Sequence, residues 1–269
     1  MSRVVFRVSA GFLVGALVLL AVALRLSEYY LVEGQQLSAA GDVQGAIDYS
    51  QMAARFDPFD TEALETRSLL FEQQARYEDA AGALREAIRR DPHNYIPYLM
   101  LGNLQLNELD DLDAAEESYR NVLRLNPQEN TVREALGQVL IQQGELGEAK
   151  DQYEKLRREG NISFQGLYDL GRIHVRTGQP QEGLQAIKHA RQRAESGLDE
   201  LEGPLKRTRK QLLVSMELAI ADALVVQGRY SEAREIISQS QSPQAPALLQ
   251  LLDSNPDAYR ESVLTSEIY

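Results

Sequence analysis

The phrases "AARFDP" (53–58), "AIRRDP" (87–92) and "VLRLNP" (122–127) recur along the chain and end in prolines 34 and 35 residues apart. Ahead of each proline, two positions seven residues apart are small or β-branched, and a third position lies four residues after the first. The same spacing returns six times: Ala46/Ser50/Ala53, Ala80/Leu84/Ala87, Ala115/Tyr119/Val122, Ala149/Tyr153/Leu156, Gly183/Ile187/Ala190 and Ala233/Ile237/Ser240. A period of this length indicates stacked supersecondary units, since one unit cannot bury its apolar face alone.

The first half of each period has its own phrase: "YLMLG" (98–102), "VREALG" (132–137) and "LYDLG" (167–171). Together these motifs resemble the tetratricopeptide repeat family. The resemblance implies an all-α fold, a right-handed α-solenoid of about six helix–turn–helix units over residues 27–240. The units start near Ser27, Thr61, Tyr95, Asn130, Phe164 and Val214.

The spacing has a steric reason. Gly or Ala at the eighth and twentieth places lets the two helices of a unit approach closely, and bulky residues at intervening places fill the space between pairs. Proline at the thirty-second place has a fixed φ and no N–H, so it ends the second helix.

Three stretches depart from the period. The third unit has an extra residue in its inner turn, "NELDDLD" (107–113). An extended linker or helix near 195–213 precedes the sixth unit, whose first helix we expect to be long, over 205–227. Residues 241–269, with a cluster of leucines, are expected to form a capping helix and tail that cover the last open face.

The N-terminus predicts a membrane anchor over residues 1–26. Val8–Leu24 is free of charge, and with the apolar residues before it is long enough to span a bilayer. A cleaved signal peptide is the alternative, because "AVA" (21–23) has the form of a cleavage site. Gly11 and Gly15 share one helix face, which would allow close packing on another membrane helix.

The charges around this span predict its orientation. Arg3 and Arg7 precede it and only Arg25 follows closely, so we expect the N-terminus inside the cytoplasmic (inner) membrane and the repeats outside the cytoplasm, in a single-pass protein. No linker separates span and repeats, so one helix is expected from about residue 8 to about residue 39. Tyr30 fits equally an interfacial anchor and the core of the first unit.

Composition excludes several functions. The net charge is −12, or −15 without the three arginines of the first 26 residues, which makes nucleic acid an unexpected partner. Cysteine is absent, so disulfides and thiolate metal sites are excluded. No phosphate loop, nucleophile elbow or zinc motif occurs. We therefore expect no enzyme activity, no cofactor and no metal site.

The candidate site is a partner groove. The resemblance implies that places 2, 5, 9, 12 and 13 of each unit line a concave surface. In units three to five, places 9 and 13 hold paired amides and then paired guanidiniums: Asn103 and Asn107, Gln138 and Gln142, Arg172 and Arg176. Aliphatic and aromatic residues border them: Leu106, Ile141, Val175 and Tyr168. Amides can pair with a peptide backbone and arginines with an acidic group, although ordinary solvated groove residues would have the same pattern.

These features predict a membrane-anchored adaptor or scaffold that binds a protein or peptide partner, in envelope assembly, secretion or polysaccharide export. Two alternatives remain. In the first, the chain is a non-catalytic regulatory subunit of a membrane enzyme such as a polysaccharide polymerase or ligase, with a membrane-protein partner packed on its transmembrane helix. In the second, the chain is a secreted binding module released by signal cleavage.

Overall fold

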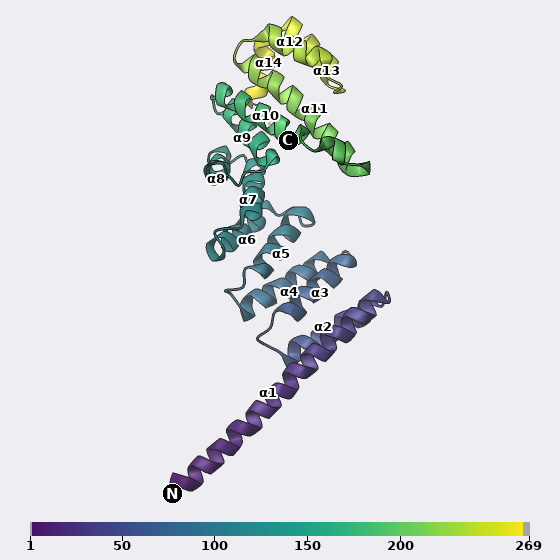
Figure 1. Cartoon of the computed structure of the whole chain (residues 1–269), viewed down its shortest axis with the longest axis vertical. Helices are drawn as coiled ribbons and strands as arrows, with labels where there is room; N and C mark the ends of the chain where they lie inside the picture. The colour runs from purple at the N-terminus through teal and green to yellow at the C-terminus, as the bar shows by residue number, and fades with distance from the viewer. Residues whose placement is uncertain (1, 266–269) are drawn as a thin grey trace. The chain divides into compact units, whose positions relative to one another are not determined.

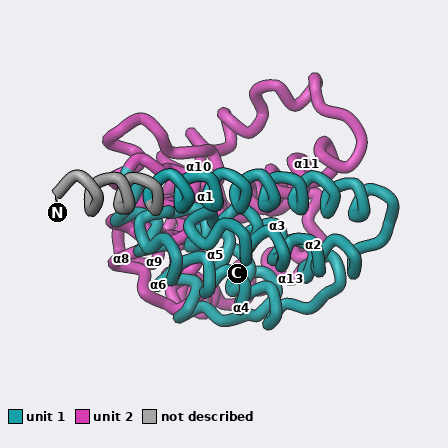
Figure 2. The backbone as a smooth tube through the Cα atoms, turned by 90° about the horizontal axis from the view of Figure 1, so that it is seen from below, with its two compact units in different colours: residues 1–127 teal, residues 128–269 magenta. Residues whose placement is uncertain are grey.

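A computed structural model describes residues 2–265 of the chain, with side chains from residue 13 onward. Over that range every regular element is a helix, and no strand occurs. The helices divide between two compact units, residues 1–127 and 128–269, which Figure 2 distinguishes by colour. Unit 1 contains six helices: α1 (Ser2–Ala39), α2 (Val43–Phe56), α3 (Glu62–Gln73), α4 (Tyr77–Arg90), α5 (Ile96–Asn107) and α6 (Leu112–Leu125).

Unit 2 contains the other eight α-helices and one 3-10 turn. They are α7 (Asn130–Gln142), α8 (Leu146–Glu159), α9 (Phe164–Arg176), α10 (Pro180–Glu195), η1 (Leu198–Glu200), α11 (Gly203–Val226), α12 (Tyr230–Gln239), α13 (Ala245–Ser254) and α14 (Pro256–Thr265). Consecutive helices pack as pairs in both units, α1 with α2 through to α11 with α12 (Figure 1). The all-helical architecture and the hairpin pairing agree with the sequence expectation.

The closest approaches within pairs occur where the sequence places glycine. A Cβ atom added to Gly102 would lie 2.8 Å from the ring of Tyr119, and one added to Gly137 would lie 2.7 Å from the ring of Tyr153. At Gly171 the added atom would meet Ile187 at 2.5 Å. Both tyrosine rings are buried. The eighth place of these units is therefore small because a bulky side chain from the second helix occupies the space beside it.

The inner turns share one backbone conformation. Gly41, Gly144, Gly178 and Gly228 each have φ between 74° and 88°. The turns of the second and third pairs place Ala75 (φ 54°) and Asp110 (φ 52°) there instead. The extra residue of the third repeat therefore lies between the end of α5 and the left-handed residue Asp110.

Helix α1 continues without a break from the apolar segment into the first pair. Its C-terminal half packs against α2, where Ser27 Oγ donates a 3.1 Å hydrogen bond to Ala53 O. Tyr30 stacks on Phe56 with ring centroids 5.5 Å apart, so its ring belongs to the core of the first pair. The expected absence of a linker between the apolar segment and the repeats is confirmed.

The C-terminal segment differs from the expectation. The long helix expected over 205–227 is α11, but residues 245–265 form two helices, α13 and α14, rather than one capping helix. Asn255 separates them, and its side-chain oxygen accepts a hydrogen bond from the backbone N–H of Ala258 in α14. Because proline at position 256 has no N–H, it ends α13 and is well suited to begin α14.

Candidate functional site

In unit 1, the predicted groove residues lie on α5. Asn107 is exposed, and Leu106 is half-buried. Asn103 is exposed as a residue, but its Oδ1 accepts a 2.9 Å hydrogen bond from the hydroxyl of Tyr119 on α6. Burial also raises the pKa of Tyr119 to about 12, so this hydroxyl keeps its proton and remains a donor. Asn103 therefore helps to hold the helix pair together, while Asn107 is open to solvent.

In unit 2, the amides of α7 are exposed and its aliphatic groove residue is packed. Gln138 and Gln142 are both exposed, one turn apart, whereas Ile141 is buried. This separation follows from the helix period, because residues four apart share a face. The two glutamines thus present a pair of amides to solvent from a rigid helix.

The arginines of α9 are in a different environment. Arg172 lies over the ring of Tyr168 at 5.2 Å and is 4.0 Å from a carboxylate oxygen of Asp169. Its side chain is only 18% exposed. Arg176 is also partly buried, and desolvation lowers its pKa. The sequence placed the two arginines on one face of the helix, but it did not show that the chain's own groups surround them.

Two carboxylates near these arginines were not among the predicted site residues. Asp169, on α9, is buried and accepts from Gln165 at 3.3 Å. Asp222, on α11, accepts a 2.9 Å hydrogen bond from the hydroxyl of Tyr259 on α14. Burial raises the pKa of each carboxyl to about 6, while the nearby positive charge of Arg172 acts in the opposite direction on both.

Asp222 could have been found from the repeat register. Counting from Val214, Asp222 occupies the ninth place of the sixth repeat, the place that Arg172 occupies in the fifth repeat. A carboxylate and a guanidinium at the same place of neighbouring repeats predict that the two charges compensate each other. Tyr259 had no such signal, because it lies beyond the last repeat.

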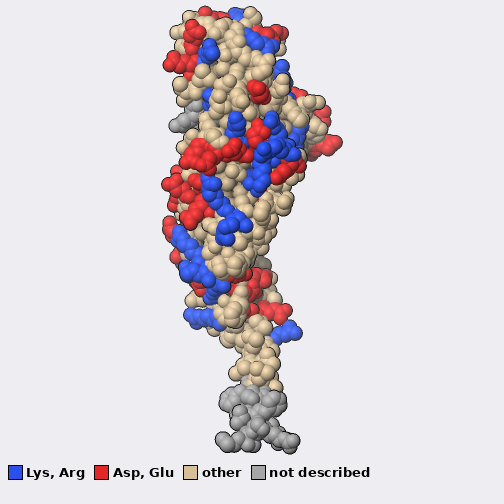
Figure 3. Space-filling model, turned by 90° about the vertical axis from the view of Figure 1, so that its left-hand side faces the viewer, with Lys and Arg blue, Asp and Glu red and all other residues tan. Residues whose placement is uncertain are grey.

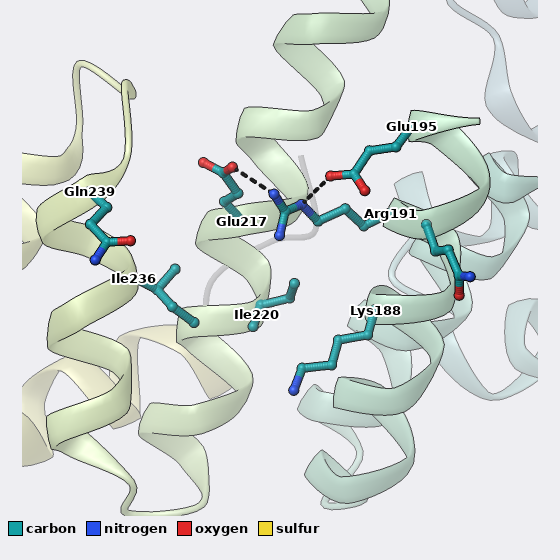
Figure 4. A pocket seen from close by; sticks show the side chains of 8 residues that line it. Lys188, Arg191, Glu195, Glu217, Ile220, Ile236 and Gln239 are labelled. Atoms are coloured by element: carbon teal, nitrogen blue, oxygen red, sulfur yellow. Dashed lines mark hydrogen bonds and ion pairs between the residues drawn. The ribbon is translucent and has the colours of Figure 1, made fainter. Parts of the chain in front are cut away.

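A hollow of about 410 Å³ lies between α10, α11 and α12. Figure 4 shows Ile220 and Ile236 facing it, with Lys188 at one side. Arg191 is drawn between the carboxylates of Glu195 and Glu217, at 3.1 and 3.2 Å. This arginine therefore joins α10 to α11 and is engaged within the chain.

The basic stretch 205–210 is partly structural. Arg209 donates to Ala194 O at 3.2 Å and lies 4.3 Å from the centre of the Phe164 ring. Lys206 lies within 4.0 Å of Asp199. These contacts connect the start of α11 to its neighbours, whereas Arg207 and Lys210 are exposed.

Among the described helices, α1 alone is long and apolar enough to cross a membrane, over Leu13–Ala39, within which an 18-residue window has a mean hydropathy of 1.6. From Leu13 to Leu24, most side chains of α1 are exposed; Leu19, for example, is 72% exposed. Figure 3 shows this part as an uncharged column, whereas charges of both signs cover the repeats. No atom lies within 4 Å of a Cβ added to Gly15, and Gly11 lies outside the residues whose side chains are described.

Comparison with known proteins gives the same architecture. A model of the tetratricopeptide repeat matches residues 31–95, 65–130, 99–161 and 135–197. The BBSome complex member BBS4 of Bos taurus is 26% identical over 146 residues, covering 54% of this chain but only 28% of BBS4. This chain therefore spans well under half the length of that relative.

Two solved structures share the fold at low identity. The MamA protein is 21% identical with a TM-score of 0.56, covering 66% of this chain and 97% of MamA. YrrB, described as a repeat protein with an unusual peptide-binding site, is 19% identical with a TM-score of 0.51, covering 60% of this chain and 82% of YrrB.

Proposed function

The chain belongs to the tetratricopeptide repeat family, whose members mediate protein–protein interactions through a fold that is generally non-catalytic, and from this premise we propose that it is a membrane-anchored adaptor or scaffold. The repeats would hold a protein or peptide partner outside the cytoplasm, in envelope assembly, secretion or polysaccharide export. Helix α1 would hold the repeats at the inner membrane.

The observation that carries this proposal is the exposure of the amide side chains on the first helices of two pairs. Asn107 on α5, and Gln138 and Gln142 on α7, are open to solvent, whereas Ile141 is buried and Leu106 is half-buried. An amide both donates and accepts, so it can pair with either group of a peptide backbone. This composition suits a partner segment recognised through its main chain as well as its side chains.

Helix α1 supports the anchoring half of the proposal. Its apolar residues are exposed in the chain alone, and exposed apolar surface of this extent needs a nonpolar environment. The arginines at positions 3 and 7 favour an N-terminus inside the cytoplasm. A signal sequence has the same length and composition, so sequencing the N-terminus of the mature protein distinguishes an anchor from a secreted module.

The continuity of α1 favours a second candidate function, that of a non-catalytic subunit of a membrane enzyme such as a polysaccharide polymerase or ligase. Because one helix runs from the apolar segment into the first pair, the repeats would lie directly at the membrane surface, beside any multi-span partner. Gly11 and Gly15 would give such a partner a face for close packing.

Co-purification from membranes in mild detergent tests both functions. We expect a partner to co-purify with the full chain and to be lost from the variant Asn107→Ala/Gln138→Ala/Gln142→Ala, while the control Gln185→Ala, an exposed amide on the second helix α10, retains it. A stoichiometric multi-span enzyme among the retained proteins supports the subunit function. Equal recovery with the triple variant and the control would refute the amide face as the binding surface.

A further inference from the structure

The C-terminal helix α14 occupies part of the face that the repeat pattern assigns to a partner. It packs against α9 and α11, which are the first helices of the fifth and sixth pairs, as well as against α13. First helices line the concave side in this family, so α14 does not simply extend the stack beyond α12 and α13. Figure 1 shows α14 drawn beside α11 in unit 2.

Two side chains of α14 are buried, and they lie on one edge of the helix. Tyr259 is 1% exposed and Val263 is 5% exposed, and these residues lie one helical turn apart. The opposite side of α14 is open to solvent at Arg260 and Glu261. The helix therefore has the form of an amphipathic ligand helix that lays an apolar edge into a groove.

The polar contact of α14 falls on a groove place. The Tyr259 hydroxyl donates to Asp222 at 2.9 Å. Asp222 holds the ninth place of the sixth repeat, and Arg172 on α9 holds the ninth place of the fifth repeat. The buried Tyr259 hydroxyl requires such an acceptor, and the half-buried carboxylate of Asp222 gains a donor in return. The bond therefore resembles a recognition contact between a groove and its ligand.

The attachment of α14 would allow it to leave. It has ten residues, and isolated helices of that length are marginal in water, so it depends on this docking for its order. A single residue, Asn255, connects it to α13. Undocking would thus leave the repeat pairs themselves intact.

We infer that α14 is a tethered occupant of the α9–α11 face, and that the partner accepted there is an amphipathic helix that presents an aromatic hydroxyl to Asp222 and displaces α14. This inference rests on the proposed function, since it names the kind of partner that one part of the groove takes. An extended peptide, which has no helical one-turn repeat, would instead suit an exposed amide pair such as Gln138 and Gln142 of α7.

A labelled peptide of residues 255–265 tests the inference without knowledge of the natural partner. Its binding to the full chain in detergent is measured by fluorescence anisotropy, for the parent, for Tyr259→Ala/Val263→Ala, which frees the face, and for the control Arg260→Ala, which alters an exposed residue of α14. We expect the double variant to bind the peptide at least about tenfold more tightly than the parent or the control. A peptide with phenylalanine in place of the tyrosine should bind about tenfold more weakly, the change that corresponds to loss of one hydrogen bond.

A folded double variant that binds no peptide, or that binds the tyrosine and phenylalanine peptides equally, would overturn the inference. If circular dichroism shows the double variant unfolded, Tyr259→Phe decides the question by hydrogen exchange. Amides of α14 should then exchange about tenfold faster than in Arg260→Ala, with α9 still protected, and unchanged exchange contradicts the inference. These outcomes are independent of co-purification through the amides of α5 and α7.

Discussion

The hydroxyl of Tyr259 lies 2.9 Å from a carboxylate oxygen of Asp222, which joins α14 to α11 across 37 residues of sequence. The contact closes one part of a face whose residues otherwise resemble a partner groove. It also places the half-buried carboxyl of Asp222 where the positive charges of Arg172 and Arg176 act on it. Stability and its pH dependence are therefore coupled at this point of unit 2.

Two carboxyls, of the buried Asp169 and the half-buried Asp222, predict how stability changes with pH. Burial raises the pKa of Asp222 and of Asp169 from near 3.8 to about 6. A carboxyl with a higher pKa in the folded chain holds its proton more tightly there, so its contribution to stability is present at low pH and lost as the pH rises through about 6. From pH 7 to pH 5, we expect each carboxyl to add about 1 kcal/mol to the free energy of unfolding.

Urea unfolding at the two pH values, followed by circular dichroism, measures this effect against matched variants. Asp222→Asn keeps an acceptor for Tyr259 but removes the titration, so its gain on acidification should be smaller than that of the parent. The control Asp253→Asn alters an exposed carboxylate that pairs with Arg234. This pairing lowers the pKa of Asp253, so the control should not reduce the gain. An identical pH response of the parent and Asp222→Asn would show that the pKa of this carboxyl is not raised in the folded chain.

The close approach at Gly171 predicts a large effect from one methyl group. Gly171→Ala would place Cβ 2.5 Å from Ile187 and 3.0 Å from the backbone oxygen of Gly183, so α9 and α10 must separate. We expect a loss of about 1–3 kcal/mol in the free energy of unfolding. The control Gly147→Ala, on α8, meets no atom within 4 Å and should stabilise by about 0.5–1 kcal/mol through helix propensity. Equal thermal shifts for the two variants would argue against this packing.

The inner turn of the second pair predicts a stabilising glycine. Ala75 has φ 54°, a left-handed conformation that costs a residue with a Cβ about 1–2 kcal/mol. Ala75→Gly relieves this cost but increases the freedom of the unfolded chain, so we expect a net gain of about 0.5–1 kcal/mol. Gln74→Gly, at φ −96°, supplies the control and should destabilise. A lower melting temperature for Ala75→Gly would contradict the turn geometry.

The orientation of the membrane anchor is tested by a reporter fused after Tyr269. A reporter enzyme that is active only outside the cytoplasm should be active, and Arg3→Glu/Arg7→Glu should weaken its signal because the positive charges hold the N-terminus inside. The paired control replaces Arg25, which follows the span, and should not reduce the signal. Activity restricted to a reporter that works only in the cytoplasm would reverse the proposed topology.

The repeat positions were predictable because they depend on local spacing. Gly102, Gly137 and Gly171 recur in register with the bulky residues that fill the space beside them, and helix pairing follows from that register. The two C-terminal helices were not predictable in the same way. Their leucines indicate apolar helix, but a segment outside the period carries no signal for the face on which it packs.

The candidate site was predictable only in part, for a related reason. The four-residue spacing placed Gln138 with Gln142 and Arg172 with Arg176 on common helix faces. Whether such a face is open depends on what packs there from elsewhere in the chain. The Tyr119 hydroxyl that donates to Asn103, and the helix that carries Tyr259, were not visible from spacing alone.

The first helices should present the protein-binding face of this chain. Photo-cross-linking in living cells locates that face, with a photoreactive residue placed in turn at Asn107, at Gln142 and at the control Gln185 on α10. We predict that the first two positions form an adduct with the same protein and that the control forms none. Adducts from the control position alone, or equal adducts from all three, would contradict this prediction.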